Sequence, residues 1–179
     1  MRTYTQTDEL DAIMEELIAT KEYHHDLHVT GAAIQVIFHF GGAGEALVHQ
    51  GTTCLAYVES TPLRFRALGL KDATIIVDHA SWEKFDDARR RALVDHELYH
   101  LAVKKNRKGD NVIDYLGRPK FAMRQHDIEV GWFAEIAKEH KEASIEAMQA
   151  GTIVENYRQT IFRFAALPAK AVKHKVKTH

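Results

Sequence analysis

Two histidines and a glutamate lie within one apolar stretch of the chain, LVDHELYHLAV, residues 93–103. On a helix, His96 and His100 leave the same face one turn apart, close enough to hold a single metal ion. Glu97 stands beside them, where a carboxylate can accept the proton of a metal-activated water that attacks a carbonyl. This HExxH spacing predicts a zinc-dependent peptidase, a hydrolase in which Glu97 is the catalytic general base.

The apolar residues around the motif indicate that its helix is central in the fold. Leu93 and Val103 fall on nearly the same helical face as the two histidines, while Leu98 and Leu101 make the other side apolar. A chain of this composition would contain such a pattern by chance only roughly 0.06 times. The alternative is a pair of packed histidines with a solvated glutamate, but the inward-facing placement favours metal binding.

A third ligand is expected downstream, in the segment FAMRQHDIEVGWF, residues 121–133. His126 is the preferred ligand and Glu129 the alternative, because residues three apart share a helical face and one can support the other. Asp127 would then orient an imidazole from outside the metal's own ligands. The competing interpretation is that His126 caps a helix, while the carboxylates of Asp127 and Glu129 interact favourably with the positive end of the helix dipole. The prediction is one Zn²⁺ per chain, since His-rich tetrahedral sites suit zinc.

The peptidase prediction also requires a donor for the oxyanion and a surface for the substrate. Tyr115 and Arg124 are candidate donors by their position between the motif and the third ligand. The strand ATIIVDH, residues 73–79, is expected near the cleft as an edge strand that pairs with an extended peptide. A peptide or protein is therefore the predicted substrate.

The elements that must position these residues can be predicted from periodicity and capping. Thr7 should cap a helix over TDELDAIMEELIAT, and three or four strands are expected between Ala32 and His79. Ser81 should cap the motif helix, which continues through Val103. A loop folded back as a short hairpin is expected over residues 104–120, then a helix from about His126 to Gly151 and another over 153–167.

Together these elements predict an α+β, zincin-like single domain. A small twisted sheet would pack against a central HExxH helix, with additional helices at both ends. The domain is expected to cover residues 1–167, and residues 168–179 form a basic tail that should be mobile. No internal repeat supports a second domain.

Composition restricts the function classes further. The 179 residues are 45% hydrophobic, enough for one core, and 24 basic residues against 25 acidic ones give a formal charge of −1. The single cysteine, Cys54, excludes disulfides and a four-cysteine zinc cluster. The sequence shows no signal peptide and no apolar run long enough for a membrane span, so a cytoplasmic location without a membrane partner is expected.

Two further charge patterns are weaker signals. His24, His25 and His28 have metal-like spacing but lack a fourth partner, and solvated histidines are the expectation. Arg89–Arg91 and the lysines of the tail could contact phosphates, but nucleic-acid binding has weak support because no aromatic residues interleave in the tail. The alternative to a peptidase is a non-catalytic, metal-stabilised binding module, which could contact nucleic acid through that tail.

The run LVDHELYHL, preceded by ATIIVDHASW and followed by HDIEVGWF, resembles the phage metallopeptidases, a zincin-like group of phages and prophages. The likeness covers roughly residues 52–139. It implies a zinc peptidase fold with His96, His100 and His126 as ligands and Glu97 as base. The chain departs from the pattern at Val130 and Tyr99, where members often carry a second acid and a cysteine, respectively. It lacks the HExxHxxGxxH spacing of metzincins and the cysteine pair of zinc deaminases.

Overall fold

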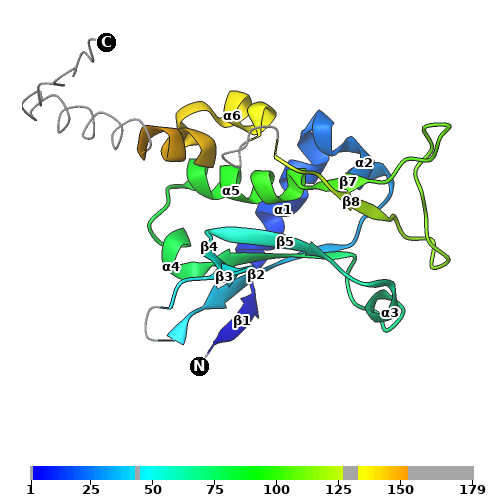
Figure 1. The fold of residues 1–179 in the computed structure, drawn as a ribbon, viewed down its shortest axis with the longest axis horizontal. Helices are drawn as coiled ribbons and strands as arrows, with labels where there is room; N and C mark the ends of the chain where they lie inside the picture. The colour runs from blue at the N-terminus through cyan, green and yellow to red at the C-terminus, as the bar shows by residue number, and fades with distance from the viewer. Residues whose placement is uncertain (1, 43–44, 127–132, 153–179) are drawn as a thin grey trace, which may run out of the picture.

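The computed structural model describes residues 2–42, 45–126 and 133–152, and its framework is a mixed four-stranded sheet (Figure 1). The strand order is β1-β2-β6-β5, formed by β1 (Thr3–Gln6), β2 (Ile34–Phe40), β6 (Ala73–Asp78) and β5 (Ala56–Ser60). The central strands β2 and β6 are parallel, and each outer strand is antiparallel to its neighbour. The chain is thus a mixed α+β protein, as predicted from the sequence.

The strand predicted to be an edge, β6, lies inside the sheet. Its residues are buried at five of six positions, which explains the nearly continuous apolar run ATIIVD. The edge next to the motif helix is β5, whose first residues alternate between buried and half-buried. The prediction of an edge strand at residues 73–79 is therefore wrong, and β5 takes that position.

The N-terminal helix forms as its pattern predicts. Thr7 is the N-cap of α1 (Asp8–Thr20), and its hydroxyl oxygen accepts a hydrogen bond from the amide of Leu10 at 3.5 Å. Leu10, Met14 and Leu17 are buried in the core, which they share with the sheet. The chain then passes through the short helices η1 (Glu22–His24) and α2 (His25–Val29).

The motif helix, α5 (Asp87–Tyr99), begins later and ends earlier than predicted. Ser81 lies within the separate helix α4 (His79–Trp82), and Asp86 caps α5 by accepting a hydrogen bond from the amide of Arg89. After Tyr99 the chain forms β7 (Leu101–Val103), which pairs with β8 (Phe121–Met123). The predicted continuation of the helix through Val103 is wrong, because these apolar residues find their partner in a distant strand.

The helix α5 packs between the sheet and the C-terminal helices (Figure 1). Residues 92–98 are all buried, so the motif helix is central, as its apolar surroundings predict. Within the described residues, no helix has the length and apolar character needed to cross a membrane.

The remaining elements refine the predicted order. The two-residue strands β3 (Val48–His49) and β4 (Thr52–Thr53) raise the described strands between Ala32 and His79 to five, and α3 (Leu63–Arg66) follows β5. Residues 104–120, here called the arm, fold back through bridges between Lys105 and Asn111 and between Ile113 and Pro119, which confirms the predicted hairpin.

The single helix predicted from about His126 to Gly151 is interrupted. In the described part, α6 (Ala134–His140) is followed by η3 (Lys141–Ala143), and residues 145–152 are helical again. The break coincides with Lys141, whose φ of 50° does not fit a continuous right-handed helix. The predicted helix over 153–167 and the tail over 168–179 lie outside the described residues.

Candidate metal centre

Three imidazoles converge at the C-terminal end of α5. His96 lies on the last turn of the helix, His100 is its C-cap, and His126 follows β8. One ring nitrogen from each lies within 4.8 Å of the others, and the Nε2 atoms of His96 and His126 are 3.2 Å apart. Nitrogens bound at about 2.0–2.1 Å to a tetrahedral zinc would be roughly 3.3 Å apart. The donor set and its spacing fit a zinc ion.

The β7–β8 pair brings His126 to this position. Leu101 lies opposite Met123 in the antiparallel register, so the chain leaving β8 returns alongside the end of α5. The amide of Arg124 donates a 2.7 Å hydrogen bond to the carbonyl of His100, which fixes the two segments together. The early end of the helix at Tyr99 therefore creates the hairpin that closes the site.

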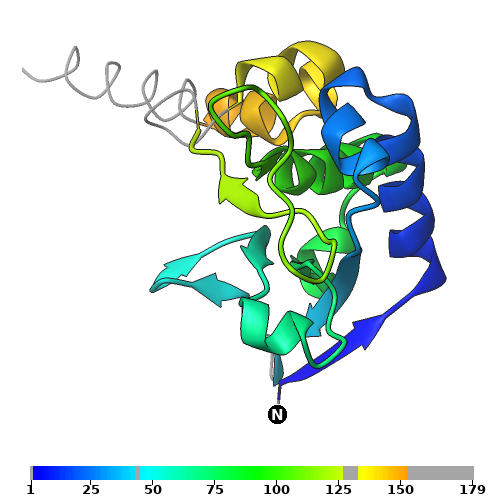
Figure 2. The same cartoon turned by 90° about the vertical axis from the view of Figure 1, so that its right-hand side faces the viewer.

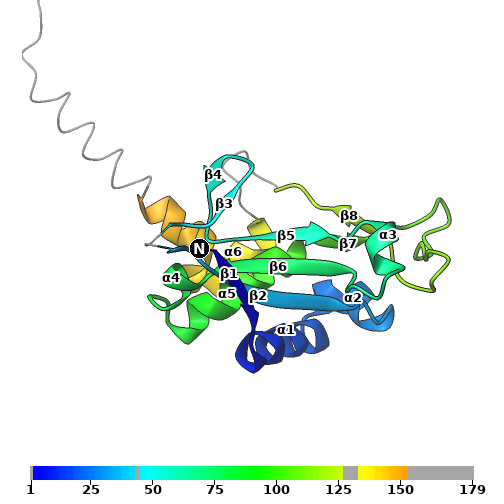
Figure 3. The ribbon, with the colours of Figure 1, turned by 90° about the horizontal axis from the view of Figure 1, so that it is seen from below.

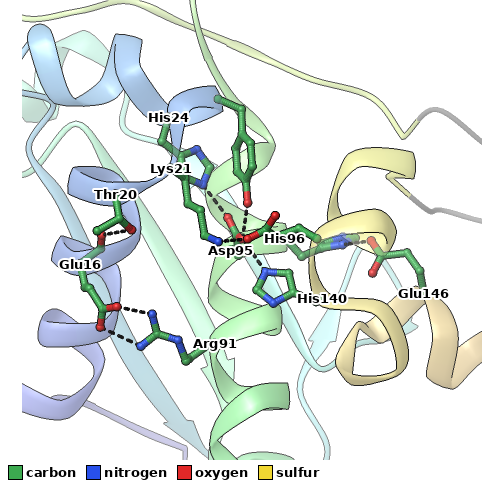
Figure 4. Close-up of polar contacts among 11 residues, drawn as sticks. Glu16, Thr20, Lys21, His24, Arg91, Asp95, His96, His140 and Glu146 are labelled. Atoms are coloured by element: carbon green, nitrogen blue, oxygen red, sulfur yellow. Dashed lines mark hydrogen bonds and ion pairs between the residues drawn. The ribbon is translucent and has the colours of Figure 1, made fainter.

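Two of the three imidazoles are oriented through their second nitrogen. His96 Nδ1 lies 2.8 Å from a carboxylate oxygen of Glu146 (Figure 4), and His100 Nδ1 lies 2.8 Å from the backbone carbonyl of Arg124. Because a carboxylate and a carbonyl accept hydrogen bonds, each Nδ1 carries the proton and each Nε2 is left as the ligand atom. This tautomer is the one that metal binding needs.

Phe133 forms an apolar wall behind the cluster. Its ring is fully buried and lies with its centroid 4.7–4.9 Å from the ring centroids of His96, His100 and His126. The amide of Phe133 also donates a 3.3 Å hydrogen bond to the Glu146 oxygen that orients His96. Phe133 thus packs against all three rings and also holds the acidic partner of His96.

Glu97 faces the same space from inside the protein. It is only 5% exposed and lines a cleft of about 920 Å³ together with the three histidines. Burial raises the pKa of its carboxyl to about 7, although the nearby His96 opposes the shift. A carboxylate with a pKa near neutrality is suited to accept a proton and to return it.

The pKa values of His96 and His100 are shifted in opposite directions. Burial and the neighbouring imidazoles lower the pKa of His100 to about 4. Burial also disfavours the charged form of His96, but the hydrogen bond to Glu146 and the charge of Glu97 outweigh it and raise its pKa. Metal ligands must be neutral imidazoles, so affinity is expected to fall on acidification, with His96 protonating before His100.

A second buried cluster holds α5 from its other side (Figure 4). The carboxylate of Asp95 is fully buried and accepts three hydrogen bonds of 2.6 Å, from Tyr23, His24 and His140. Burial alone would raise the pKa of Asp95, but these hydrogen bonds outweigh it and hold the pKa well below its ordinary value. The cluster joins η1, α5 and α6 next to His96.

The expectation that His24 is solvated is therefore wrong. His24 is 2% exposed because its ring is enclosed between η1 and α5. His25 and His28, by contrast, are exposed.

We expect Asp95→Ala to lower the free energy of unfolding by about 3 kcal/mol, because three buried donors lose their common acceptor. For a chain of this size the melting temperature should fall by about 6–12 °C. The measurement is urea and thermal denaturation followed by circular dichroism, in the presence of a chelator so that metal binding does not contribute. Asp87→Ala, at a 96% exposed side chain of the same helix, is the matched control. Equal stabilities of the two variants would contradict a stabilising role for the cluster.

Of the two predicted oxyanion donors, Arg124 lies at the cleft and Tyr115 does not. Arg124 lines the cleft, stacks 3.8 Å over the ring of Tyr99 and donates to the Tyr99 carbonyl at 2.7 Å. Tyr115 is 73% exposed on the arm and is not among the residues that line the cleft. Asp127 and Glu129 lie outside the described residues.

Two of the three arginines considered for phosphate contacts form ion pairs with the N-terminal helix. Arg90 pairs with Glu9, and Arg91 forms a two-pronged ion pair with Glu16 on α1. Arg89 takes part in neither of these two ion pairs. Arg90 and Arg91 thus fasten α5 to the N-terminal helix.

An α+β domain in which an HExxH helix and a third histidine converge beside a buried glutamate has the residues of a metal-dependent hydrolase. The model of the family described as "Putative phage metallopeptidase" matches residues 2–158, and the chain belongs to this family. The match extends well beyond residues 52–139, where the sequence resemblance was recognised. No curated protein and no solved structure matches the chain.

Membership of this family supports a hydrolase at the level of its class. The family implies a metal ion, and the histidine cluster is a site that could bind one. It also points to peptide substrates and gives no support to nucleic-acid binding.

Proposed function

We propose that this protein is a zinc-dependent peptidase with a zincin-like site. His96, His100 and His126 would hold one Zn²⁺, and Glu97 would act as the general base. The observation that carries the proposal is the convergence of three imidazole nitrogens beside a buried carboxylate in a solvent-accessible cleft. Glu129, the alternative third ligand, remains a candidate because it follows closely after His126 in the chain.

In this proposal the chain's own residues move the proton. When bound, zinc would lower the pKa of a coordinated water toward roughly 7 and polarise the scissile carbonyl. Glu97 accepts the proton of the attacking water and returns it to the leaving amine. Glu146 and the Arg124 carbonyl hold two imidazoles in orientation, and the guanidinium of Arg124 is the candidate donor to the oxyanion.

The edge strand β5 supports a peptide as the substrate. Its residues Ala56, Tyr57 and Val58 line the same cleft as the three histidines. Its outer backbone edge has no partner strand within the described sheet, so an extended peptide can add to it by main-chain hydrogen bonds. A substrate bound in this way would lie in the same cleft as Glu97.

The test is metal-dependent cleavage of an unfolded carrier protein. The protein purified from ordinary medium should cleave the carrier, lose activity when a chelator removes the metal, and regain it when about one equivalent of zinc is added. Fragments identified by mass spectrometry would give the bonds that are cut. Cleavage that persists after complete metal removal would reject the proposal.

The alternative is a non-catalytic module with a structural metal, in which Glu97 would have no catalytic role. A structural zinc site is closed by four protein ligands and has no need of a base. Here a buried carboxylate with a pKa of about 7 adjoins the three histidines and opens to the cleft. This arrangement favours catalysis.

A further inference from the structure

A surface that combines exposed apolar and basic side chains lies at one end of the molecule. It consists of residues 63–71, which contain α3, and of the arm, residues 104–120; here they are called the α3–arm surface. Figure 2 looks onto this end of the fold, and Figures 1 and 3 place α3 and the arm at the same side. None of its residues lines the candidate metal centre.

The surface gathers most of the large apolar side chains exposed in the described structure. Of eleven such residues, seven belong to these two segments. Residues 63–71 contribute Leu63, Phe65, Leu68 and Leu70, of which Leu68 is 76% exposed. The arm contributes Ile113, Tyr115 and Leu116. Apolar exposure concentrated in this way is typical of an interaction site.

The same two segments are strongly basic although the whole chain carries a formal charge of −1. Their only exposed acidic residue is Asp110. Besides Lys105, which pairs with Asp26, the exposed basic residues are Arg64, Lys71, Lys104, Arg107, Lys108 and Lys120. The surface is thus complementary to a ligand that is both acidic and apolar.

Buried ion pairs hold the two segments together as one platform. The carboxylate of Asp72, which is fully buried, pairs with Arg66 of α3 at 2.5 Å and with Arg118 of the arm at 2.7 Å. Arg66 also pairs with Asp114 at 3.2 Å and donates to the carbonyl of Pro119 at 3.0 Å. Buried charges in such a network define geometry more than they add stability. The arm is therefore presented in a defined position beside α3.

Both walls of the cleft run into this surface. On one side β5 leaves the cleft after Val58, ends at Ser60, and is followed by α3. On the other side β8 begins at Phe121, directly after the arm, and leads through Met123 to His126. Strand residues rise about 3.3 Å each, so a peptide paired with β5 would reach α3 about four residues beyond the residue opposite Ala56.

From this arrangement we infer that the α3–arm surface is a second substrate-binding site, which holds an acidic and apolar segment of the polypeptide on one side of the bond to be cleaved. The inference rests on the proposed peptidase function and names the class of substrate that the enzyme prefers. The apolar side chains bury those of the ligand, and the surrounding lysines and arginines attract its carboxylates and exclude basic sequences.

The test compares short and extended substrates. The short substrate is a peptide of about six residues that spans a bond cleaved in the unfolded carrier. Two longer peptides add about eight residues, alternately acidic and apolar, to its N-terminal end or to its C-terminal end. An extension in which lysine replaces every acid is the control peptide. The acidic extension at one end should raise kcat/KM about tenfold through a lower KM, and added salt should reduce the gain.

The protein variants separate charge from apolar contact. The double variant Arg107→Glu with Lys108→Glu, and separately Leu68→Ser, should bring the ratio of kcat/KM for extended over short peptide close to one. Lys84→Glu and Tyr4→Ser are the matched controls, because both residues are exposed and lie outside the two segments. Equal gains from the acidic and lysine extensions, or a gain that survives both arm and α3 variants, would overturn the inference.

A direct binding measurement keeps this inference distinct from the proposed function. Fluorescence anisotropy of the labelled acidic extension, added to Glu97→Gln protein, should show binding that the double variant weakens about tenfold. If the wild type cleaves no peptide, the peptidase proposal fails and the anisotropy result still decides the surface. Tighter binding to phosphatidylserine vesicles or to single-stranded oligodeoxythymidylate than to the acidic extension would overturn the assignment to a polypeptide.

Discussion

Glu97→Gln should reduce kcat for peptide cleavage by at least about 10³-fold and leave the zinc content unchanged. Glutamine has nearly the same volume as glutamate but cannot accept a proton at neutral pH. The carboxylate is 5% exposed and lines the same cleft as the histidines, so bulk water offers a poor substitute. Initial rates on a fluorogenic peptide and elemental analysis of the same samples give both quantities.

A control substitution and the zinc content show whether a loss of activity in Glu97→Gln comes from the missing base or from a missing metal. Glu83→Gln changes an exposed glutamate next to α4 and should leave both measurements at the wild-type level. Retention of more than about a tenth of the activity in Glu97→Gln would place the general base elsewhere. Loss of zinc together with activity would show that Glu97 serves the metal site and not the proton transfer.

His96→Ala and His126→Ala should each reduce zinc affinity by at least about 100-fold. Loss of a ligand must cost more than loss of a residue that only orients one, for which 10- to 100-fold is typical. Wild-type protein should carry about one zinc per chain, and both variants should be purified nearly free of it. Elemental analysis followed by titration with a chromophoric chelator measures content and affinity.

Glu129→Ala, measured in parallel, identifies the third ligand. If His126 is the ligand, Glu129→Ala keeps its zinc while His126→Ala loses it; the opposite pattern would assign the role to Glu129. His28→Ala removes an exposed histidine and is the control for nonspecific loss of metal. A wild-type protein that holds no zinc even when zinc is supplied would contradict the metal site altogether.

The elements that depend on local pattern could be predicted from the sequence. The capped, amphipathic helix α1 appears where Thr7 and its apolar spacing place it, because capping and helical periodicity act within one or two turns. The convergence of His96 and His100 follows in the same way from their separation of four. The sequence also predicts His126 as the preferred third ligand, and in the structure the β7–β8 pair brings the ring of His126 close to His96 and His100.

Residues that act through distant partners could not be found in this way. His96 contacts Glu146 across 50 positions, and Asp95 contacts His24 across 71, so no local spacing signals either pair. His24 was assigned to solvent for this reason. A buried acid within an otherwise apolar helix face, as at Asp95, is the one feature that indicates an unseen partner.

The errors in strand and helix assignment have a related cause. Residues 101–103 are a short apolar run that fits a helix or a strand equally, and only pairing with residues 121–123 decides between them. The run at residues 73–78 is nearly continuous in its apolar character, which is typical of an interior strand and not of an edge. Strand order, which decides where a substrate can add, depends on contacts that the sequence does not display.

The contacts of Asp95 and Glu146 also affect the protein before its synthesis is complete. The carboxylate of Asp95 needs His140, and the orientation of His96 needs Glu146, so both depend on residues made long after the HExxH helix itself. Because a chain emerges from the ribosome with its N-terminal part first, a partly synthesised copy carries the motif without these supports. The buried supports of the HExxH helix therefore form only after the C-terminal helices have been made and have docked against it.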